Sequence, residues 1–176
     1  PGKGLVGIEV PNQRVGSVSV REMLQSEAFQ RAKQLALPLA IGKDVSGAPI
    51  VSDLARMPHL LIAGSTGSGK TICVHNLVLS LLYRASPDEV RLLLIDPKMV
   101  ELAAFNDLPH LVTPVVTDAK AAARALTWVV QEMERRYKIF AKLGVRNLEM
   151  HNERGGRSPG DEDLPRDGLA VVPEAQ

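Results

Sequence analysis

The sequence is poor in aromatic residues and contains a single cysteine. Phe, Trp and Tyr make up 3% of its 176 residues, so the core must be built from Leu, Val, Ile and Ala. Such a core favours helices packed on a sheet over an aromatic-rich β-sandwich. Because Cys73 is alone, the chain forms no internal disulfide, which is consistent with a reducing compartment.

A large net charge and a long apolar run are also absent. With 21 basic and 20 acidic residues the formal net charge is +1, so the whole-chain balance indicates neither nucleic acid nor an acidic membrane as a partner. No run approaches the roughly 18–20 apolar residues of a membrane span. The chain begins with Pro1 and lacks the apolar stretch of a signal peptide. We therefore expect it to be part of a longer protein, whose membrane attachment this absence does not decide.

One motif stands out in residues 64–71, which follow the pattern G-x-x-x-x-G-K-[ST]. Its members are Gly64, Ser65, Thr66, Gly67, Ser68, Gly69, Lys70 and Thr71. The apolar run 60–63 before it predicts a strand buried on both faces. After it, apolar residues of the segment 70–84 recur at helical spacing and predict a helix with one buried stripe. Strand, glycine-rich loop and helix in this order are typical of a phosphate-binding P-loop.

Each residue type of the motif has a physical role in binding phosphate. Gly64, Gly67 and Gly69 permit positive φ and a close approach of the backbone to phosphate. Successive N–H groups and the N-terminus of the helix then attract phosphate oxygens. Lys70 would neutralise the β- and γ-phosphates, and the Thr71 hydroxyl would bind Mg²⁺. The motif predicts binding of a nucleotide, with ATP and Mg²⁺ as the expected ligands.

The rest of the chain supplies further elements. Ser19 and Glu22 have the spacing of a capping box before a helix of about three turns. Residues 35–54 predict a β-hairpin, and 91–95 a second buried strand that forms a parallel βαβ unit with 60–63. The longest helix begins near Thr117 or Asp118 and ends before Gly144. One of its faces is apolar and consists of Leu126, Val129, Val130, Met133, Tyr137 and Phe140.

Other candidate residues have weaker support. Asp96 ends the predicted strand 91–95, where it either holds Mg²⁺ through water or begins a turn before Pro97. Cys73 is expected to be a small buried side chain rather than a reactive thiol. Arg135, Arg136 and Arg146 are more consistent with surface ion pairs than with an arginine finger. No metal-ligand spacing relates the four histidines, which are His59, His75, His110 and His151.

Several blocks of sequence resemble one family, in the same order. They are residues 1–12 and 54–71, the block Leu94-Ile95-Asp96-Pro97-Lys98, residues 109–118, and residues 132–137 with 144–147. Together they resemble the motor domain of the FtsK/SpoIIIE double-stranded DNA translocases of bacteria, over residues 1 to about 153. Several blocks in order are more specific than the P-loop motif by itself.

The resemblance implies an α/β fold, a RecA-like P-loop NTPase core in which helices flank a parallel sheet. It implies a small N-terminal lobe at 1–36, a partial ATPase core at 37–153 and a polar, mobile tail at 154–176. Motors of this family form hexameric rings around duplex DNA and use ATP and Mg²⁺ for translocation in chromosome segregation and cell division. The parent protein would be bacterial, and either cytoplasmic or anchored in the inner membrane.

The family pattern also changes the role expected for Asp96, and this sequence differs from that pattern in one respect. In the family, the Walker B strand follows the long helix and ends in Asp-Glu, so Asp96 would lie on a neighbouring strand. No such run follows residue 150, and the nearest approach is Leu169-Ala170-Val171-Val172-Pro173. We therefore expect the core to be incomplete at its C-terminus, with weak nucleotide binding and poor hydrolysis by this chain alone.

Three other interpretations stay open at this point. A related pump of conjugation or secretion systems would move single-stranded DNA or protein. A small-molecule kinase would need a substrate lid and a base, and neither is evident in the sequence. A nucleotide-gated assembly module would respond to ATP without turnover. Residues 118–154 hold eight basic and five acidic residues, a net of +3 that does not by itself indicate DNA binding.

Overall fold

The computed structural model describes residue 10 and residues 16–57 and 59–154. These residues form two compact units, one ending at Arg84 and the other beginning at Ala85. The division into a lobe, a core and a tail stays a prediction. The predicted mobile tail lies, except for Arg154, outside the described residues, as do Leu169 to Pro173.

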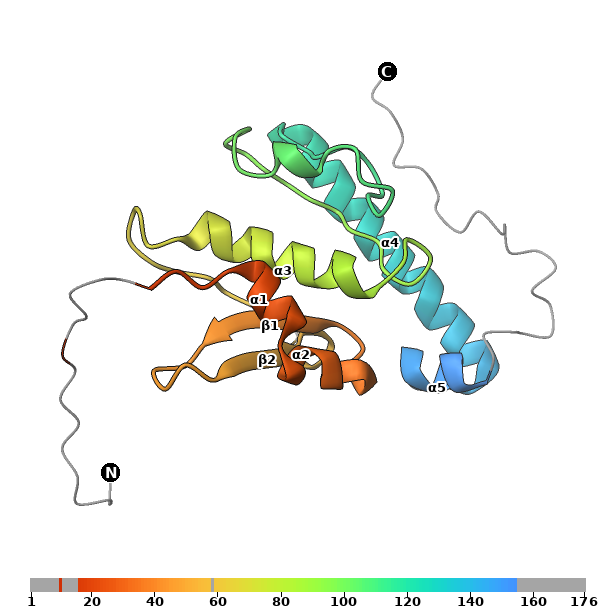
Figure 1. Cartoon of the computed structure of the whole chain (residues 1–176). Helices are drawn as coiled ribbons and strands as arrows, with labels where there is room; N and C mark the ends of the chain where they lie inside the picture. The colour runs from red at the N-terminus through yellow and green to blue at the C-terminus, as the bar shows by residue number, and fades with distance from the viewer. Residues whose placement is uncertain (1–9, 11–15, 58, 155–176) are drawn as a thin grey trace, which may run out of the picture. The chain divides into compact units, whose positions relative to one another are not determined.

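The first unit combines short helices, a β-hairpin and one longer helix (Figure 1). Its elements are α1 (Val20–Gln25), α2 (Glu27–Arg31), the 3-10 turn η1 (Ala32–Gln34), β1 (Pro38–Lys43), β2 (Pro49–Asp53), the 3-10 turn η2 (Leu54–Arg56) and α3 (Lys70–Arg84).

The β-hairpin confirms the prediction for residues 35–54. β1 and β2 are antiparallel, with Pro38 opposite Asp53 and a shift in register between Ala40 and Gly42. The connecting turn is organised by Asp44, whose carboxylate accepts hydrogen bonds from the backbone N–H groups of Ser46 and Ala48. An aspartate that bonds to nearby backbone N–H groups is a common way to fix such a turn.

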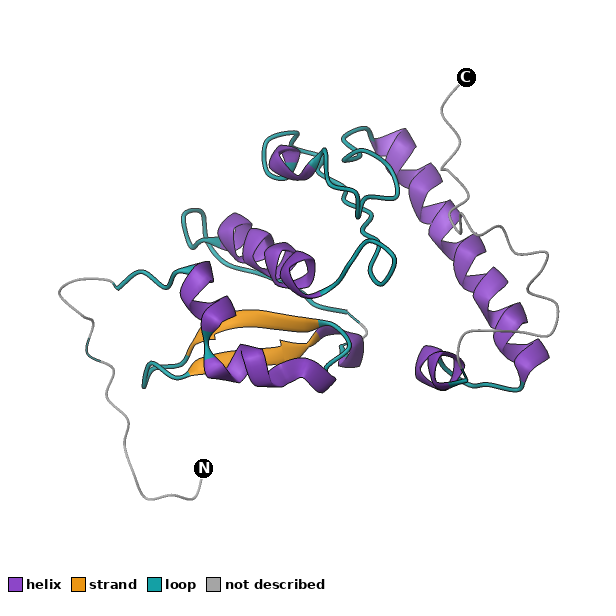
Figure 2. Ribbon diagram, turned by 45° about the vertical axis from the view of Figure 1, so that its right-hand side comes forward, coloured by secondary structure: helices purple, strands orange, loops and turns teal. Residues whose placement is uncertain are grey.

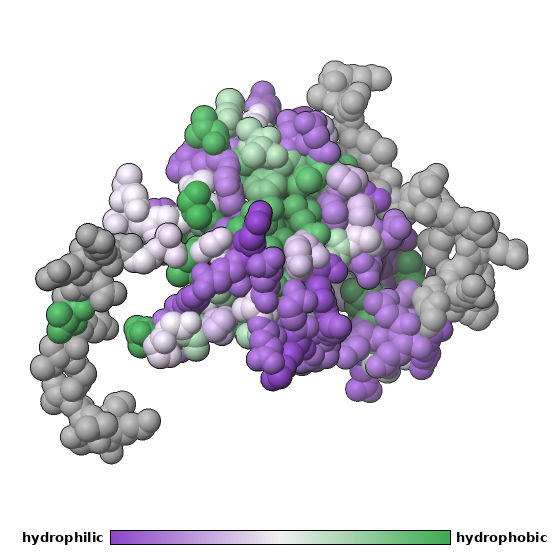
Figure 3. Space-filling model, in the orientation of Figure 1, coloured by the Kyte–Doolittle hydropathy of each residue, from purple (hydrophilic) through white to green (hydrophobic). Residues whose placement is uncertain are grey.

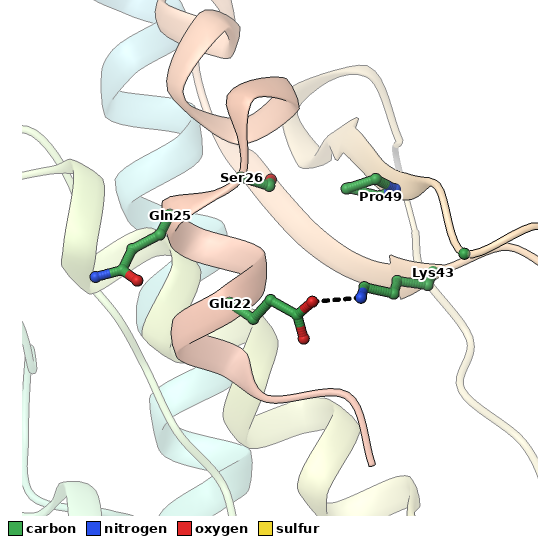
Figure 4. Close-up of a pocket in the computed structure, with 6 residues that line it drawn as sticks. Glu22, Gln25, Ser26, Lys43 and Pro49 are labelled. Carbon is green, nitrogen blue, oxygen red and sulfur yellow. Dashed lines mark hydrogen bonds and ion pairs between the residues drawn. The ribbon is translucent and has the colours of Figure 1, made fainter. Parts of the chain in front are cut away.

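The predicted capping box at Ser19 is wrong. Ser19 makes no side-chain cap, and Glu22 is instead ion-paired with Lys43 of β1 (Figure 4). The expected three-turn helix is divided at Ser26, whose hydroxyl accepts from the N–H of Phe29 and so caps α2. The sequence pattern failed here because a distant lysine competes for Glu22, and because a serine within the helical run begins a new helix.

The core of the first unit lies where α1 and α2 meet the hairpin and α3. A buried cluster is formed by Met23, Leu24, Phe29 and Ala40. Helix α3 packs against β1 and buries Leu77, Val78 and Leu81, which confirms the predicted apolar stripe. Because α3 begins at Lys70, this packing also fixes the helix whose N-terminus meets the glycine-rich loop.

The strand predicted at 60–63 is not formed. These residues have no regular secondary structure, and Leu61 is 89% exposed. A buried strand needs neighbouring strands to satisfy its N–H and C=O groups. In the described part of the first unit, β1 and β2 pair with each other. The apolar run therefore has no strand partner there.

The second unit contains the 3-10 turn η3 (Ala103–Phe105), the 25-residue helix α4 (Ala119–Leu143) and the short helix α5 (Leu148–Glu153), which Figure 2 shows beyond the end of α4. The strand predicted at 91–95 is reduced to two isolated parallel bridges, Leu92 with Leu111 and Ile95 with Val116. Pro114 lies between the two bridged partners and lacks an N–H, which interrupts a continuous ladder.

The boundaries of α4 confirm the sequence prediction, whereas its apolar face is not buried. The Asp118 carboxylate accepts from the N–H of Ala121, and Gly144 ends the helix with φ 63°. Among the predicted face residues, Leu126 is 54% and Tyr137 59% exposed, and the helix is instead buried at Ala125. Figure 3 shows apolar residues at the surface of the molecule among polar ones. Periodicity thus located the apolar face and did not identify what covers it.

Candidate phosphate-binding site

The glycine-rich loop precedes α3 directly and leads into its first turn (Figure 1). Residues 64–69 are exposed, and Lys70 and Thr71 are half-buried. The loop closes through a backbone hydrogen bond from Ser68 N–H to the carbonyl of Ser65, at 3.2 Å. The structure therefore brings the eight predicted residues together in one exposed loop at the N-terminus of a helix.

The three glycines of the loop serve two different purposes. Gly67 and Gly69 have φ of 82° and 88°, in the left-handed region that other residues rarely adopt. A Cβ on either would point into open space, so the constraint there is the backbone conformation. At Gly64 a Cβ would lie 2.4 Å from the Ser68 Oγ, so the constraint is close packing. The backbone conformation explains glycine at positions 67 and 69, whereas a Cβ at position 64 would require the Ser68 side chain to move.

Lys70 folds back over the loop. Its ammonium group donates to the carbonyl oxygens of Gly64 and Ser65, at 2.6 and 2.8 Å. Both acceptors are neutral, and a charge-assisted bond to a phosphate oxygen would be stronger. The lysine is thus held at the loop by two bonds that an anion can replace.

The first turn of α3 offers further donors. The first hydrogen bond of the helix runs from Cys73 N–H to the Gly69 carbonyl, at 2.8 Å. The N–H groups of Lys70, Thr71 and Ile72 precede this bond and have no partner among the described residues. Together with the partial positive charge of the helix terminus they favour an anion. The donor set, the exposed loop and the folded lysine fit the phosphates of a nucleotide.

Two other side chains of this turn were singled out from the sequence. Thr71 is half-buried, and its hydroxyl has no hydrogen bond to the described residues, so it is free to bind a ligand. Cys73 is also half-buried and is a free thiol. Cys73 is therefore less buried than the sequence predicts, and whether it packs or reacts stays a prediction.

Asp96 has a structural role that the sequence did not define. Its side chain is 3% exposed and accepts hydrogen bonds from the N–H groups of Glu101 and Leu102, at 2.8 and 2.9 Å, and of Lys98, at 3.2 Å. These bonds, that from Leu102 first, hold the pKa of Asp96 below its ordinary value. The turn they close places Met99 at φ 63°. With both carboxylate oxygens occupied, Asp96 organises this turn, which agrees with the alternative that it begins a turn.

The remaining candidates from the sequence are arginines, considered for ion pairs, and histidines, considered for a metal site. Arg135 and Arg136 both donate to Glu132, at 2.7 Å, which confirms surface ion pairing. The hydrogen bond from Arg135 is the main cause that lowers the pKa of the Glu132 carboxyl. Glu134 and Lys138 are also four residues apart, and they form no ion pair. No group of three or more His, Cys, Asp or Glu side chains is placed to hold a metal within the part of the chain that the structure describes.

Two buried polar residues have roles that the sequence pattern did not indicate. The Ser80 hydroxyl donates to the Asn76 carbonyl and accepts from the Ala40 N–H, which ties α3 to β1. His110 is 8% exposed, and its Nε2 lies 2.9 Å from the Ala85 carbonyl oxygen. A serine beside the apolar stripe of α3 was a visible signal for the first, whereas nothing in the sequence distinguished His110 from the other histidines.

The chain is similar in sequence to known proteins. Residues 19–172 match the FtsK/SpoIIIE family. The chain is 55% identical over 165 residues to the DNA translocase SftA of Bacillus subtilis, covering 94% of this chain and 17% of the relative. It is 56% identical over 154 residues to the DNA translocase FtsK of Haemophilus influenzae, covering 88% of this chain and 29% of that relative.

A third relative, the DNA translocase FtsK of Clostridium tetani, is 54% identical over 165 residues, which cover 94% of this chain and 22% of the relative. The chain thus spans less than a third of the length of these curated relatives. In the described part of the chain, no helix is both long and apolar enough to cross a membrane. The family match covers most of the chain and includes the whole loop 64–71, so this α/β chain with a P-loop belongs to the FtsK/SpoIIIE family.

Proposed function

We propose that residues 64–71 bind the phosphates of ATP together with Mg²⁺, and that the chain is the nucleotide-binding part of an ATP-driven double-stranded DNA translocase. The observation that carries this proposal is the loop itself, in which Lys70 is held over two carbonyls beside the free N–H groups of α3. The relatives are named DNA translocases, which favours DNA translocation over a pump of conjugation or secretion.

Each part of the loop has a role in this proposal. The Lys70 ammonium leaves the carbonyls of Gly64 and Ser65 and neutralises the phosphates. Gly67 and Gly69 keep the backbone in the conformation that exposes N–H groups to them. The Thr71 hydroxyl is placed to hold Mg²⁺. When bound, Mg²⁺–ATP supplies the phosphoanhydride bond whose hydrolysis drives movement.

At the level of the whole protein the proposal includes a RecA-like core with a parallel sheet and a hexameric ring around duplex DNA. The expected setting is bacterial chromosome segregation and cell division, with the motor in the cytoplasm and the parent protein either free there or anchored in the inner membrane. The division into a lobe at 1–36, a core at 37–153 and a tail at 154–176 belongs to the same proposal. The family match over residues 19–172 supports the assignment to a DNA motor, and the domain bounds, the parallel sheet and the hexameric ring are further parts of the proposal.

Titration of the chain with a fluorescent ATP analogue in the presence of Mg²⁺ tests the nucleotide site directly. Charge-assisted hydrogen bonds contribute about 1.5–3 kcal/mol each, so Lys70→Ala should weaken binding about tenfold to a hundredfold. Lys33→Ala is the matched control, because Lys33 is an exposed lysine without a partner among the described residues. Binding of the analogue to Lys70→Ala as tightly as to the wild type would refute the site, provided that both melt alike.

A further inference from the structure

Helix α4 carries an exposed row of basic side chains. Lys120 and Lys138 are 18 residues apart, as are Arg124 and Lys142, and 18 residues are about five turns of an α-helix. The two members of each pair therefore share a direction, and the two directions differ by only about 40°. These four residues form a stripe of about 33 Å along one side of the helix, made of one pair near each end with about 21 Å between the pairs. We call Lys120, Arg124, Lys138 and Lys142 the α4 basic stripe.

The charges of the α4 basic stripe are free. All four side chains are exposed, and none makes an ion pair or hydrogen bond with the described residues. The neighbouring Arg135 and Arg136 differ, because both are held by Glu132. Glu134 lies four residues before Lys138 and forms no ion pair with it. Free lysines and arginines in a row contribute a local positive potential that their paired neighbours do not.

The charge of α4 also differs from that of the chain. Residues 119–143 contain six basic and two acidic residues, a net of +4, whereas the whole chain has a net charge of +1. The positive charge is therefore concentrated on this helix. A repeating anionic polymer matches such a linear arrangement better than a single anion does.

Duplex nucleic acid has the required geometry. The two residues of each i, i+4 pair are about 6 Å apart along the helix, which is close to two phosphate steps of about 3.4 Å along one strand of B-DNA. Long, flexible lysines bind phosphate as point charges and do not distinguish bases. The stripe therefore matches a phosphate backbone without sequence preference.

An anionic membrane presents the same charge and fits less well. The exposed apolar residues of α4, such as Leu126 and Tyr137, lie about 120–140° around the helix from the α4 basic stripe. A flat lipid surface that takes up these apolar side chains would have the stripe turned away from its headgroups. A single flat membrane surface therefore does not contact both the α4 basic stripe and these apolar residues.

We propose that the α4 basic stripe binds the phosphate backbone of duplex nucleic acid. This inference rests on the proposed function for the choice of DNA as the partner. It adds a contact surface outside the phosphate-binding loop, on a helix of the other unit of the chain.

Anisotropy of a labelled duplex of about 30 base pairs, measured from about 50 to 200 mM salt, tests the stripe. Each lost phosphate contact flattens the slope of log K against log salt by about 0.9. The double variants Lys120→Gln/Lys138→Gln and Arg124→Gln/Lys142→Gln should each flatten it by about 1.8, and the quadruple variant by about 3.6, with duplexes of any sequence. Arg21→Gln/Lys33→Gln removes the same charge from exposed positions of the first unit and should leave the slope unchanged.

Three results of the duplex titration would overturn the proposal. They are an unchanged slope in the quadruple variant, an equal loss in the control, and no duplex binding by the wild type at the lowest salt. A loss of binding to phosphatidylserine vesicles with unchanged duplex binding would also overturn it and assign the stripe to a membrane. Nucleotide binding in each variant shows that the chain is folded and separates this result from the Lys70 test, which does not depend on DNA.

Discussion

At the scale of single residues, the phosphate-binding loop depends on the backbone conformations that its residues can adopt. Gly67 and Gly69 adopt φ of 82° and 88°, and Gly144, at the end of α4, adopts 63°. A residue with a Cβ costs roughly 1–2 kcal/mol in this region. Gly67 and Gly144 are both open to an added Cβ, so the strain there is not complicated by a steric clash. The two glycines therefore allow conformational strain to be separated from ligand binding.

We expect Gly67→Ala and Gly144→Ala to lower the free energy of unfolding by a similar amount, about 1–2 kcal/mol. Only Gly67→Ala should also weaken binding of the ATP analogue, because only Gly67 lies in the loop proposed to enclose phosphate. Urea unfolding and nucleotide titration of both variants measure the two effects separately. Equal nucleotide affinity in the two variants would contradict the role of the Gly67 conformation in binding.

At the scale of elements, the sequence predicted those whose determinants are local. The length of α3 follows from an apolar repeat, and the limits of α4 from Asp118 and Gly144. The hairpin turn follows from Asp44 and its neighbours. The loop 64–71 was found for the same reason, since its chemistry lies in eight consecutive residues.

Elements that depend on distant partners were predicted less well. A strand is completed by the segment beside it, and neither the apolar run 60–63 nor the run 91–95 identifies that segment. The first is not a strand, and the second bridges residues 111–116, where Pro114 interrupts the pairing. The roles of Glu22, Asp96 and Ser80 likewise depend on contacts that no local spacing encodes.

Ser80 provides a test of how α3 is held against the hairpin. Its hydroxyl is fully buried and accepts the Ala40 N–H at 3.1 Å. Ser80→Ala leaves this N–H without a partner, and such a buried group costs about 1–3 kcal/mol. Thermal and urea unfolding should therefore show a loss of this size. Ser46→Ala, at an exposed serine of the hairpin turn, is the comparison and should cost less, and an equal loss would argue against the α3–β1 bond as the cause.

At the scale of the whole molecule, the carboxylates set the response to acid. Four carboxyl groups in the described part of the chain have a shifted pKa, and all four are lowered: Asp44, Glu89, Asp96 and Glu132. The pKa of Asp44 is lowered chiefly by the Ser46 hydroxyl, and that of Glu89 by the Ser86 N–H. The pKa of Asp96 is lowered chiefly by the Leu102 N–H, and that of Glu132 by Arg135. A group with a lowered pKa stabilises the folded state when it is ionised in both states. That stabilisation is lost as the pH falls through the pKa of the folded state.

The urea midpoint of the chain should accordingly fall as the pH is lowered below about 4.5 and continue to fall below 3.8, the ordinary values for Glu and Asp. Asp96→Asn should lower the midpoint at neutral pH and flatten its fall in acid, because the amide cannot lose the three N–H bonds by protonation. Asp88→Asn, at an exposed carboxylate without a hydrogen bond to the described residues, is the matched control. Parallel acid profiles for Asp96→Asn and the wild type would show that the carboxylate of Asp96 does not hold its turn.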